Sequence, residues 1–148
     1  MNISDILTPE RTLADLKCAS KKRTLESISK WLGDQMTAFD GKELFNALIN
    51  REKLGSTGFG DGIAIPHCRL ANCTQVTGAL VRLATAVDFD AIDQQPVDLL
   101  FVLLVPLQAT DEHLQILATL ATSFGKPEFR SNLREAADAR AMYQIAIA

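Results

Sequence analysis

The sequence predicts an α/β or α+β protein in which helices pack on both sides of a small β-sheet. Two segments with helical periodicity precede a group of short β-type segments, and helical patterns return after that group. The chain has 148 residues, of which 47% are hydrophobic, and we find no repeat, linker or low-complexity tract in it. We therefore expect a single domain over residues 1–148 with its own hydrophobic core.

The first third of the chain is expected to hold two helices. Residues 1–19 read as an irregular or strand-containing lead-in. From Ser20, a plausible N-cap, apolar side chains recur at helical spacing and predict a helix of about four turns. Asp40 and Glu43 form a capping-box pattern that opens a second helix, which carries apolar residues up to Arg51.

The middle of the chain predicts the strands of the sheet. The three predicted strands are 63–65, 76–83 and 97–105. The last is apolar on both faces apart from Asp98, which is typical of a strand buried on both sides. Turn residues at 93–96 separate it from a short extended piece at 87–89.

Three further helices are predicted in the last third of the chain. The first begins near Thr110 or Asp111 and stops at Gly125. Pro127 can occupy the first turn of the second helix, and the alanine-rich tail from Asp138 reads as the third.

Composition argues against several classes of function. The formal net charge is −3 and basic residues are dispersed, whereas nucleic-acid binding depends on clustered positive charge. Cys18, Cys68 and Cys73 are odd in number and scattered, as expected in a reducing compartment, and with the two histidines they lack any standard zinc spacing. The longest apolar run, 99–107, is too short to cross a bilayer, and the N-terminus lacks signal-peptide features. We expect a cytoplasmic protein without metal, cofactor, nucleic acid or membrane segment.

A glycine-dense segment at 55–62 is the strongest functional signal, because it contains half of the chain's 8 glycines. Glycine lets the backbone approach a ligand closely, and such a loop can aim several N–H groups at one anion. His67 follows, and a neutral imidazole can accept a phosphoryl group. We predict that Gly58 and Gly60 bind a phosphoryl group carried by His67.

Two common phosphate motifs fail in this segment. A P-loop would need lysine and serine or threonine after Gly60, where the chain has Asp61 and Gly62. A dinucleotide fingerprint would need a third glycine at Ile63 and a following helix, but the next segment reads as a strand.

The residues around the histidine resemble a known signature. Glu52 is followed by six residues, Phe59-Gly60, two residues and then Ile63-Ala64-Ile65-Pro66-His67-Cys68. This pattern resembles the phosphorylation site of enzyme IIA proteins of the fructose/mannitol class of the phosphoenolpyruvate phosphotransferase system (PTS). The runs 51–58, 89–93 and 96–101 are similar to the nitrogen-regulatory members. The resemblance covers nearly the whole chain, and Cys68 departs from the glycine common at that position.

The resemblance implies a mannitol-type IIA fold, with a mixed, partly parallel sheet flanked by helices. It also implies a phosphoryl carrier that accepts phosphate on His67 from an HPr-like phosphocarrier. Its phosphorylation state would regulate partner proteins, such as sensor kinases or potassium-transport components. The alternative is the IIA component of a sugar transporter that passes phosphate to a IIB domain. The role as an enzyme, the oligomeric state and the roles of the cysteines stay open.

Several residues are candidates for supporting the transfer. The guanidinium of Arg51 suits phosphate oxygens, although an arginine there could also interact with the C-terminus of its own helix. The resemblance favours Arg51 for the site and leaves Glu52 without a role. Ser56 and Thr57 could donate hydroxyl hydrogen bonds to the phosphoryl group or cap turns, and both interpretations stay open.

His113 is the second histidine, in the first turn of its predicted helix. It could orient His67 or bind phosphoryl oxygens, or it could be a partly buried surface residue without a role. The family has a histidine matching this position beside the active one, and this resemblance implies a supporting role for His113.

Overall fold

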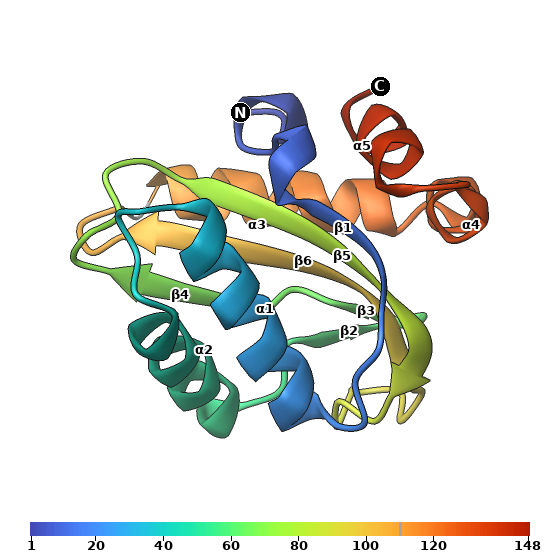
Figure 1. Ribbon diagram of the computed structural model, residues 1–148. Helices are drawn as coiled ribbons and strands as arrows, with labels where there is room; N and C mark the ends of the chain where they lie inside the picture. Colours follow the sequence, from blue (N-terminus) through green and yellow to red (C-terminus); the bar gives the residue numbers. More distant parts are fainter. Residues whose placement is uncertain (110) are drawn as a thin grey trace.

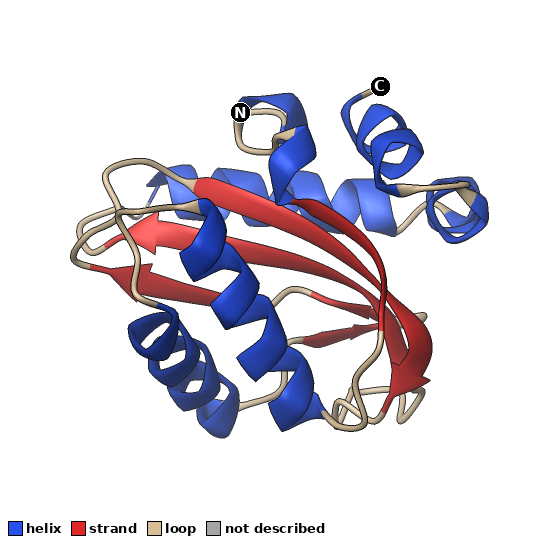
Figure 2. Cartoon of the chain, viewed as in Figure 1, coloured by secondary structure: helices blue, strands red, loops and turns tan. Residues whose placement is uncertain are grey.

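The computed structural model describes residues 1–109 and 111–148, together with their side chains except those of Glu112 and His113. The described strands form one sheet, and helices cover both of its faces (Figure 1, Figure 2). In chain order the strands are β1 Thr12–Leu16, β2 Gly58–Gly60, β3 Ile63–Ala64, β4 His67–Leu70, β5 Thr77–Val87 and β6 Val97–Pro106. The helices are α1 Lys21–Gln35, α2 Gly41–Leu54, α3 Asp111–Phe124, α4 Pro127–Glu135 and α5 Ala139–Ile147, preceded by the 3-10 turns η1 Ile3–Asp5 and η2 Pro9–Arg11.

The sheet is mixed, and the predicted fold class is confirmed. Its strand order is β1-β5-β6-β3-β2, and β4 also pairs with β6. Strand β1 is parallel to β5, and β3 and β4 are both parallel to β6. The β5–β6 and β2–β3 pairs are antiparallel. Strand β6 is therefore the central strand, and it is buried along its length except at Asp98 and Pro106.

Two hydrophobic clusters hold the layers together, one on each face of the sheet. Helices α1 and α2 cover one face, and η1, α3, α4 and α5 lie over the other (Figure 1). Strand β6 contributes Leu100, Val102 and Leu104 to the first cluster and Leu99, Phe101 and Leu103 to the second. This alternation follows from the two-residue period of a strand and explains why β6 is apolar on both faces.

Side-chain caps define the starts of α1 and α5. The Ser20 hydroxyl accepts a hydrogen bond from the backbone N–H three residues later at 3.1 Å, and the Asp138 carboxylate accepts the equivalent bond at 2.9 Å. The predicted start of α2 after Asp40 is also confirmed. The predicted capping box is wrong, because the Asp40 carboxylate is exposed and makes no cap bond. Helix α2 continues past Arg51 to Leu54.

The predicted lead-in, the strand pattern and the three C-terminal helices agree with the structure in outline. Sequence analysis missed β2 and β4, and it ended β5 before Val87. Among the described residues, no helix combines the length and apolarity that a membrane span needs.

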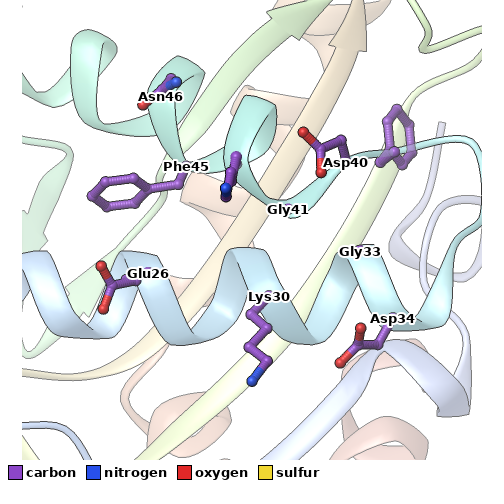
Figure 3. A pocket seen from close by; sticks show the side chains of 10 residues that line it. Glu26, Lys30, Gly33, Asp34, Asp40, Gly41, Phe45 and Asn46 are labelled. Atoms are coloured by element: carbon purple, nitrogen blue, oxygen red, sulfur yellow. The ribbon is translucent and has the colours of Figure 1, made fainter.

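Helices α1 and α2 approach closely where two glycines meet. A Cβ atom on Gly33 would lie 2.9 Å from the backbone nitrogen of Gly41. A pocket of about 620 Å³ lies along this crossing, and its lining mixes acidic, basic and aromatic side chains, including Lys30, Asp34 and Phe45 (Figure 3). This pocket contains no histidine among its described residues.

Candidate functional site

His67 lies where the chain resumes pairing with the central strand. Strands β3 and β4 both run parallel to β6, and Ile65 and Pro66 separate them. The Pro66 carbonyl accepts a hydrogen bond from the Leu103 N–H at 2.9 Å, and His67 is in register with Leu103. Proline has no N–H to donate, so the ladder is interrupted directly before the histidine. The backbone of His67 is thereby attached to the central strand of the sheet.

The imidazole of His67 is oriented by its own chain. Its Nδ1 lies 2.7 Å from the carbonyl oxygen of Ile65. A carbonyl can only accept, so Nδ1 carries the proton in this bond. In the neutral ring the lone pair then resides on Nε2. The contact therefore makes Nε2 the ring nitrogen with nucleophilic character.

The surroundings of His67 favour the neutral ring. Burial lowers the pKa of His67 below its ordinary value of 6.5, and the Arg51 charge lowers it further. The hydrogen bond to Ile65 and the charge of Glu52 raise the pKa and partly offset this effect. The net shift is downward, so the neutral form of the His67 ring is favoured near pH 7.

A surface pocket of about 430 Å³ lies between the C-terminal half of α2 and strand β4. Its described lining residues are Ala47, Asn50, Arg51, Leu54, His67, Cys68 and Arg69. None of them is acidic, and two carry guanidinium groups. Such a pocket suits an anion, because arginine presents paired N–H donors to phosphate oxygens.

The two arginines of the pocket are anchored at its opposite walls. Arg51 Nη1 donates to the carbonyl of Gly55 at 2.8 Å, which is the helix-end interaction considered from the sequence. Arg51 lines the pocket as well, so the two interpretations of this residue coexist. Arg69 Nη1 donates to the carbonyl of Leu107 at 2.9 Å. Each arginine keeps further N–H donors beyond this one bond.

Sequence analysis missed Asn50 and Arg69. The available signal for Arg69 was its position two residues after His67, since alternate residues of a strand share a face. That signal required β4 to be recognised as a strand. Asn50 precedes Arg51 on α2, and nothing in the sequence alone sets it apart.

Glu52, left without a role by the sequence, is buried and fully engaged. Its carboxylate accepts hydrogen bonds from the Thr57 N–H at 3.1 and 3.3 Å and from the Thr57 hydroxyl. It also forms an ion pair with Lys21 Nζ at 2.8 Å. The Thr57 hydroxyl is thus used inside the protein.

Ser56 and Gly58 are engaged in a similar way. The Ser56 hydroxyl donates to the Phe89 carbonyl at 2.6 Å and accepts from the Gly58 N–H at 3.0 Å. A Cβ atom on Gly58 would lie 2.7 Å from the Cα of Ala91. Close approach at Gly58 therefore serves packing against the chain itself.

Gly60 and Gly62 lie in the hairpin between β2 and β3. Gly60 and Gly62 have φ of 107° and 81°, values that favour glycine. The Asp61 N–H between them donates to the Asp93 carboxylate at 2.9 Å. This bond and one from the Gln95 N–H lower the pKa of Asp93. Gly58 and Gly60 do not line the histidine pocket, and their predicted contact with a phosphoryl group stays a prediction.

Cys68 lines the pocket but is a poor nucleophile. Burial and, to a smaller extent, the neighbouring Cys73 together raise the pKa of its thiol to about 12. The thiol is therefore protonated near pH 7. Among the described side chains, no group of three His, Cys, Asp or Glu residues is arranged to hold a metal ion. His113 belongs to α3, and its side chain lies outside the described residues, so its predicted role is not addressed by the structure.

A family model for the phosphoenolpyruvate-dependent sugar phosphotransferase system, EIIA 2, matches residues 5–147. The chain belongs to this EIIA type 2 family. The nitrogen regulatory protein of Pseudomonas aeruginosa is 49% identical over 147 residues, covering 99% of this chain and 96% of the relative. That of Escherichia coli K12 is 43% identical over 146 residues, covering 98% and 89%.

Structural comparison places the chain in the same group. The crystal structure of nitrogen regulatory protein IIA-Ntr from Neisseria meningitidis superposes with a TM-score of 0.91 at 41% identity, covering 97% of this chain and 98% of the other. The mannitol IIA of Escherichia coli gives 0.77 at 17% identity, covering 95% and 98%, which shows a shared fold. The chain is thus a nitrogen-regulatory type of EIIA family member, and the resemblance read from the residues is confirmed.

Proposed function

We propose that the chain is a phosphoryl carrier that accepts phosphate on His67 Nε2 from an HPr-like phosphocarrier. The observation that carries this proposal is the Nδ1 contact with the Ile65 carbonyl, which directs nucleophilic character to Nε2. The ring lies in a pocket with two guanidinium groups and no carboxylate among its described residues. Family membership supports the same role.

The transfer exchanges one N–P bond for another. The lone pair of His67 Nε2 attacks phosphorus in line while the N–P bond to the donor histidine breaks, and the bonding electrons return to the donor ring. His67 becomes positively charged as the bond forms. Its Nδ1–H bond to the Ile65 carbonyl strengthens as this charge develops and thereby stabilises the transition state.

Arg51 and Arg69 neutralise the transferring group. Charge on the equatorial oxygens needs N–H donors that are already in place, and both arginines are anchored to backbone carbonyls. Arg51 is the principal candidate. His113 has a supporting role in the proposal by family resemblance, as a group that orients His67 or binds phosphoryl oxygens. Ser56, Thr57, Gly58 and Gly60 contribute mainly by shaping the loop.

The labelling test uses phosphoenolpyruvate, enzyme I and an HPr-type carrier with the purified protein. One acid-labile, alkali-stable phosphoryl group should be incorporated, and His67→Ala should abolish it. Circular dichroism of the variant shows whether it is folded, and a reaction without the HPr-type carrier is the blank. Label that persists on folded His67→Ala protein would refute the assignment of the acceptor.

We propose further that phosphorylation regulates partner proteins. A phosphoryl group brings close to two negative charges at pH 7, enough to cancel the positive charge of the two guanidinium groups in the pocket. Sensor kinases or potassium-transport components are the partners that the resemblance suggests. At least one partner should bind only one phosphorylation state, which calorimetry against unphosphorylated, phosphorylated and His67→Ala protein would measure. Equal affinities for all forms would contradict the regulatory role.

A second candidate is a relay to a sugar-transporter IIB domain. It is favoured by a relative from Haloferax volcanii named a PTS system fructose-specific EIIA component, which is 35% identical over 139 residues, covering 92% of this chain and 90% of the relative. Labelled protein mixed with a fructose-type IIB domain separates the two functions. Rapid loss of label to IIB would favour the relay, and retained label would favour regulation.

A further inference from the structure

We propose that Glu52 is a positioning residue that fixes both the ring of His67 and the guanidinium of Arg51. Glu52 makes no described hydrogen bond to either side chain. The inference rests on the phosphoryl-carrier function proposed above and assigns the role of a buried carboxylate that this function leaves unexplained.

A chain of hydrogen bonds joins Glu52 to His67. The Glu52 carboxylate holds Thr57 through both its N–H and its hydroxyl. The Thr57 carbonyl accepts from the Ile65 N–H at 3.1 Å, and the Ile65 carbonyl accepts from His67 Nδ1 at 2.7 Å. The Ile65 carbonyl, which selects the tautomer of the His67 ring, is therefore connected to the Glu52 carboxylate through the backbone of Thr57.

A second connection joins Glu52 to Arg51. The Gly55 carbonyl, which anchors Arg51, lies in the short loop between Glu52 and Thr57. The Gly55 N–H donates to the Glu52 carbonyl at 3.1 Å, and the Glu52 carboxylate holds Thr57 on the other side of Gly55. A Cβ atom at Gly55 would meet nothing within 4 Å, so Gly55 itself has open space around it. Hydrogen bonds to the Glu52 carbonyl and carboxylate constrain the chain on both sides of the Gly55 carbonyl.

Lys21 stabilises the buried carboxylate of Glu52 through an ion pair. The Glu52 side chain is 2% exposed, and a buried charge without a partner is costly. Lys21 Nζ lies 2.8 Å from the carboxylate, 3.3 Å from the Phe89 carbonyl and 4.9 Å from the centre of the Phe89 ring. The same carbonyl accepts from Ser56. The first turn of α1 is thereby joined to the loop that supports the site.

The test compares Glu52→Gln, Thr57→Val and Thr57→Ser. Glutamine at position 52 retains an acceptor oxygen but loses the charge that pairs with Lys21. Valine at position 57 removes the hydroxyl, whereas serine keeps it. The matched control is Asp15→Asn, which breaks the Arg82–Asp15 ion pair elsewhere in the sheet. Three quantities are measured for each protein: thermal stability, the transfer rate at saturating phospho-donor, and the imidazole ¹⁵N shifts of His67.

Glu52→Gln and Thr57→Val should slow transfer at saturating donor by about tenfold, because small misplacements of reacting groups are expensive. Their ¹⁵N shifts should show a mixture of His67 tautomers in place of the Nδ1–H form. Thr57→Ser, which keeps the hydroxyl, should retain the wild-type transfer rate and the wild-type ¹⁵N shifts of His67. Asp15→Asn should lower thermal stability and leave the rate and the shifts unchanged.

The proposal is overturned if Glu52→Gln or Thr57→Val loses stability while keeping the wild-type rate and tautomer, as the Asp15→Asn control does. It is also overturned if the wild-type ring does not carry its proton on Nδ1. The ¹⁵N measurement needs no phosphoryl donor. Failure of wild-type protein to accept label would therefore refute the proposed function without deciding the positioning role, and the shifts of the variants would still decide it.

Discussion

The two ends of segment 52–67 handle negative charge in opposite ways. At the glycine end, backbone N–H groups of Thr57 and Asp61 are bonded to carboxylates of the protein itself, Glu52 and Asp93. At the histidine end, the pocket presents Arg51 and Arg69 and has no acidic residue among its described lining. The glycine end is therefore occupied by internal anions, and the histidine end is suited to an external one.

A glycine-rich segment can therefore indicate either a site that binds an anionic ligand or a turn that binds a carboxylate of the protein itself. Glycines that aim N–H groups at an anion do not show whether that anion is a ligand or a neighbouring side chain. Here Gly60 and Gly62 allow a hairpin turn whose N–H group binds Asp93. The architecture that they create brings β3 beside β6 and leads the chain to His67.

The contrast between the glycine end and the histidine end predicts that the largest effect on phosphoryl transfer comes from substituting Arg51. Arg51→Ala should slow phosphoryl transfer by about a hundredfold, because charge on the transferring group would lose a pre-positioned donor. Arg51→Lys should recover part of the rate, since lysine offers charge without the planar fork. Rates are measured by rapid quench with labelled phospho-donor. Lys53→Ala, an exposed cation of the same turn, is the control and should transfer normally. A normal rate for folded Arg51→Ala would return Arg51 to a helix-end role.

His113→Ala should also slow transfer, but less than Arg51→Ala, because its proposed role is to support the reacting ring. The same quench experiment measures it. A rate equal to that of the wild type would leave His113 without a role in transfer.

At the glycine end the expected effect is on stability. Gly60→Ala should lower the free energy of unfolding by about 1–2 kcal/mol, because alanine is strained at a φ of 107° although its Cβ has room beside Asp93. Urea denaturation measures this change. The transfer rate of the folded variant should equal that of the wild type. A slowed rate with native stability would instead support the predicted phosphoryl contact at Gly60.

The smallest expected effect is a pH dependence at the histidine end. Because burial lowers the pKa of His67, NMR titration should place it below 6.5, and Arg51→Ala should raise it. The folded ring then resists protonation more than the unfolded one, so stability is lost as the pH falls from 6.5 through the folded-state pKa. Melting curves of wild-type and His67→Gln protein between pH 5 and about pH 8 compare this loss, which the variant should lack. A titration at or above 6.5 would contradict the burial effect.

The parts of the fold governed by local rules could be predicted from the sequence. Ser20 and Asp138 cap their helices through bonds within one turn, and the two-sided apolar pattern of β6 is visible in the residues themselves. Strand β2 was missed because it is only three residues long and two of them are glycines. Strand β4 was missed because it is short and is defined by pairing with β6, which lies far away in the sequence.

The same distinction applies to the site. His67 and Arg51 could be found from the signature, whereas Glu52 could not be assigned a role, because its ion-pair partner Lys21 lies on another helix. The uses of Ser56 and Gly58 depend on the distant segment that contains Phe89 and Ala91. Local patterns predict chemistry here, and tertiary contacts decide which groups are available for it.

The attachment of His67 to β6 has a consequence for signalling. The Pro66 carbonyl and the residues that follow are paired with the central strand, which would leave His67 little freedom to shift upon the proposed phosphorylation. A partner protein would then detect the phosphoryl group through its negative charge and not through a change in the conformation of the chain. At physiological ionic strength the field of such a charge decays over about 8 Å. Only a partner that contacts the pocket between α2 and β4 could then sense the phosphate. Added salt should reduce the difference in its affinity for the phosphorylated and unphosphorylated forms.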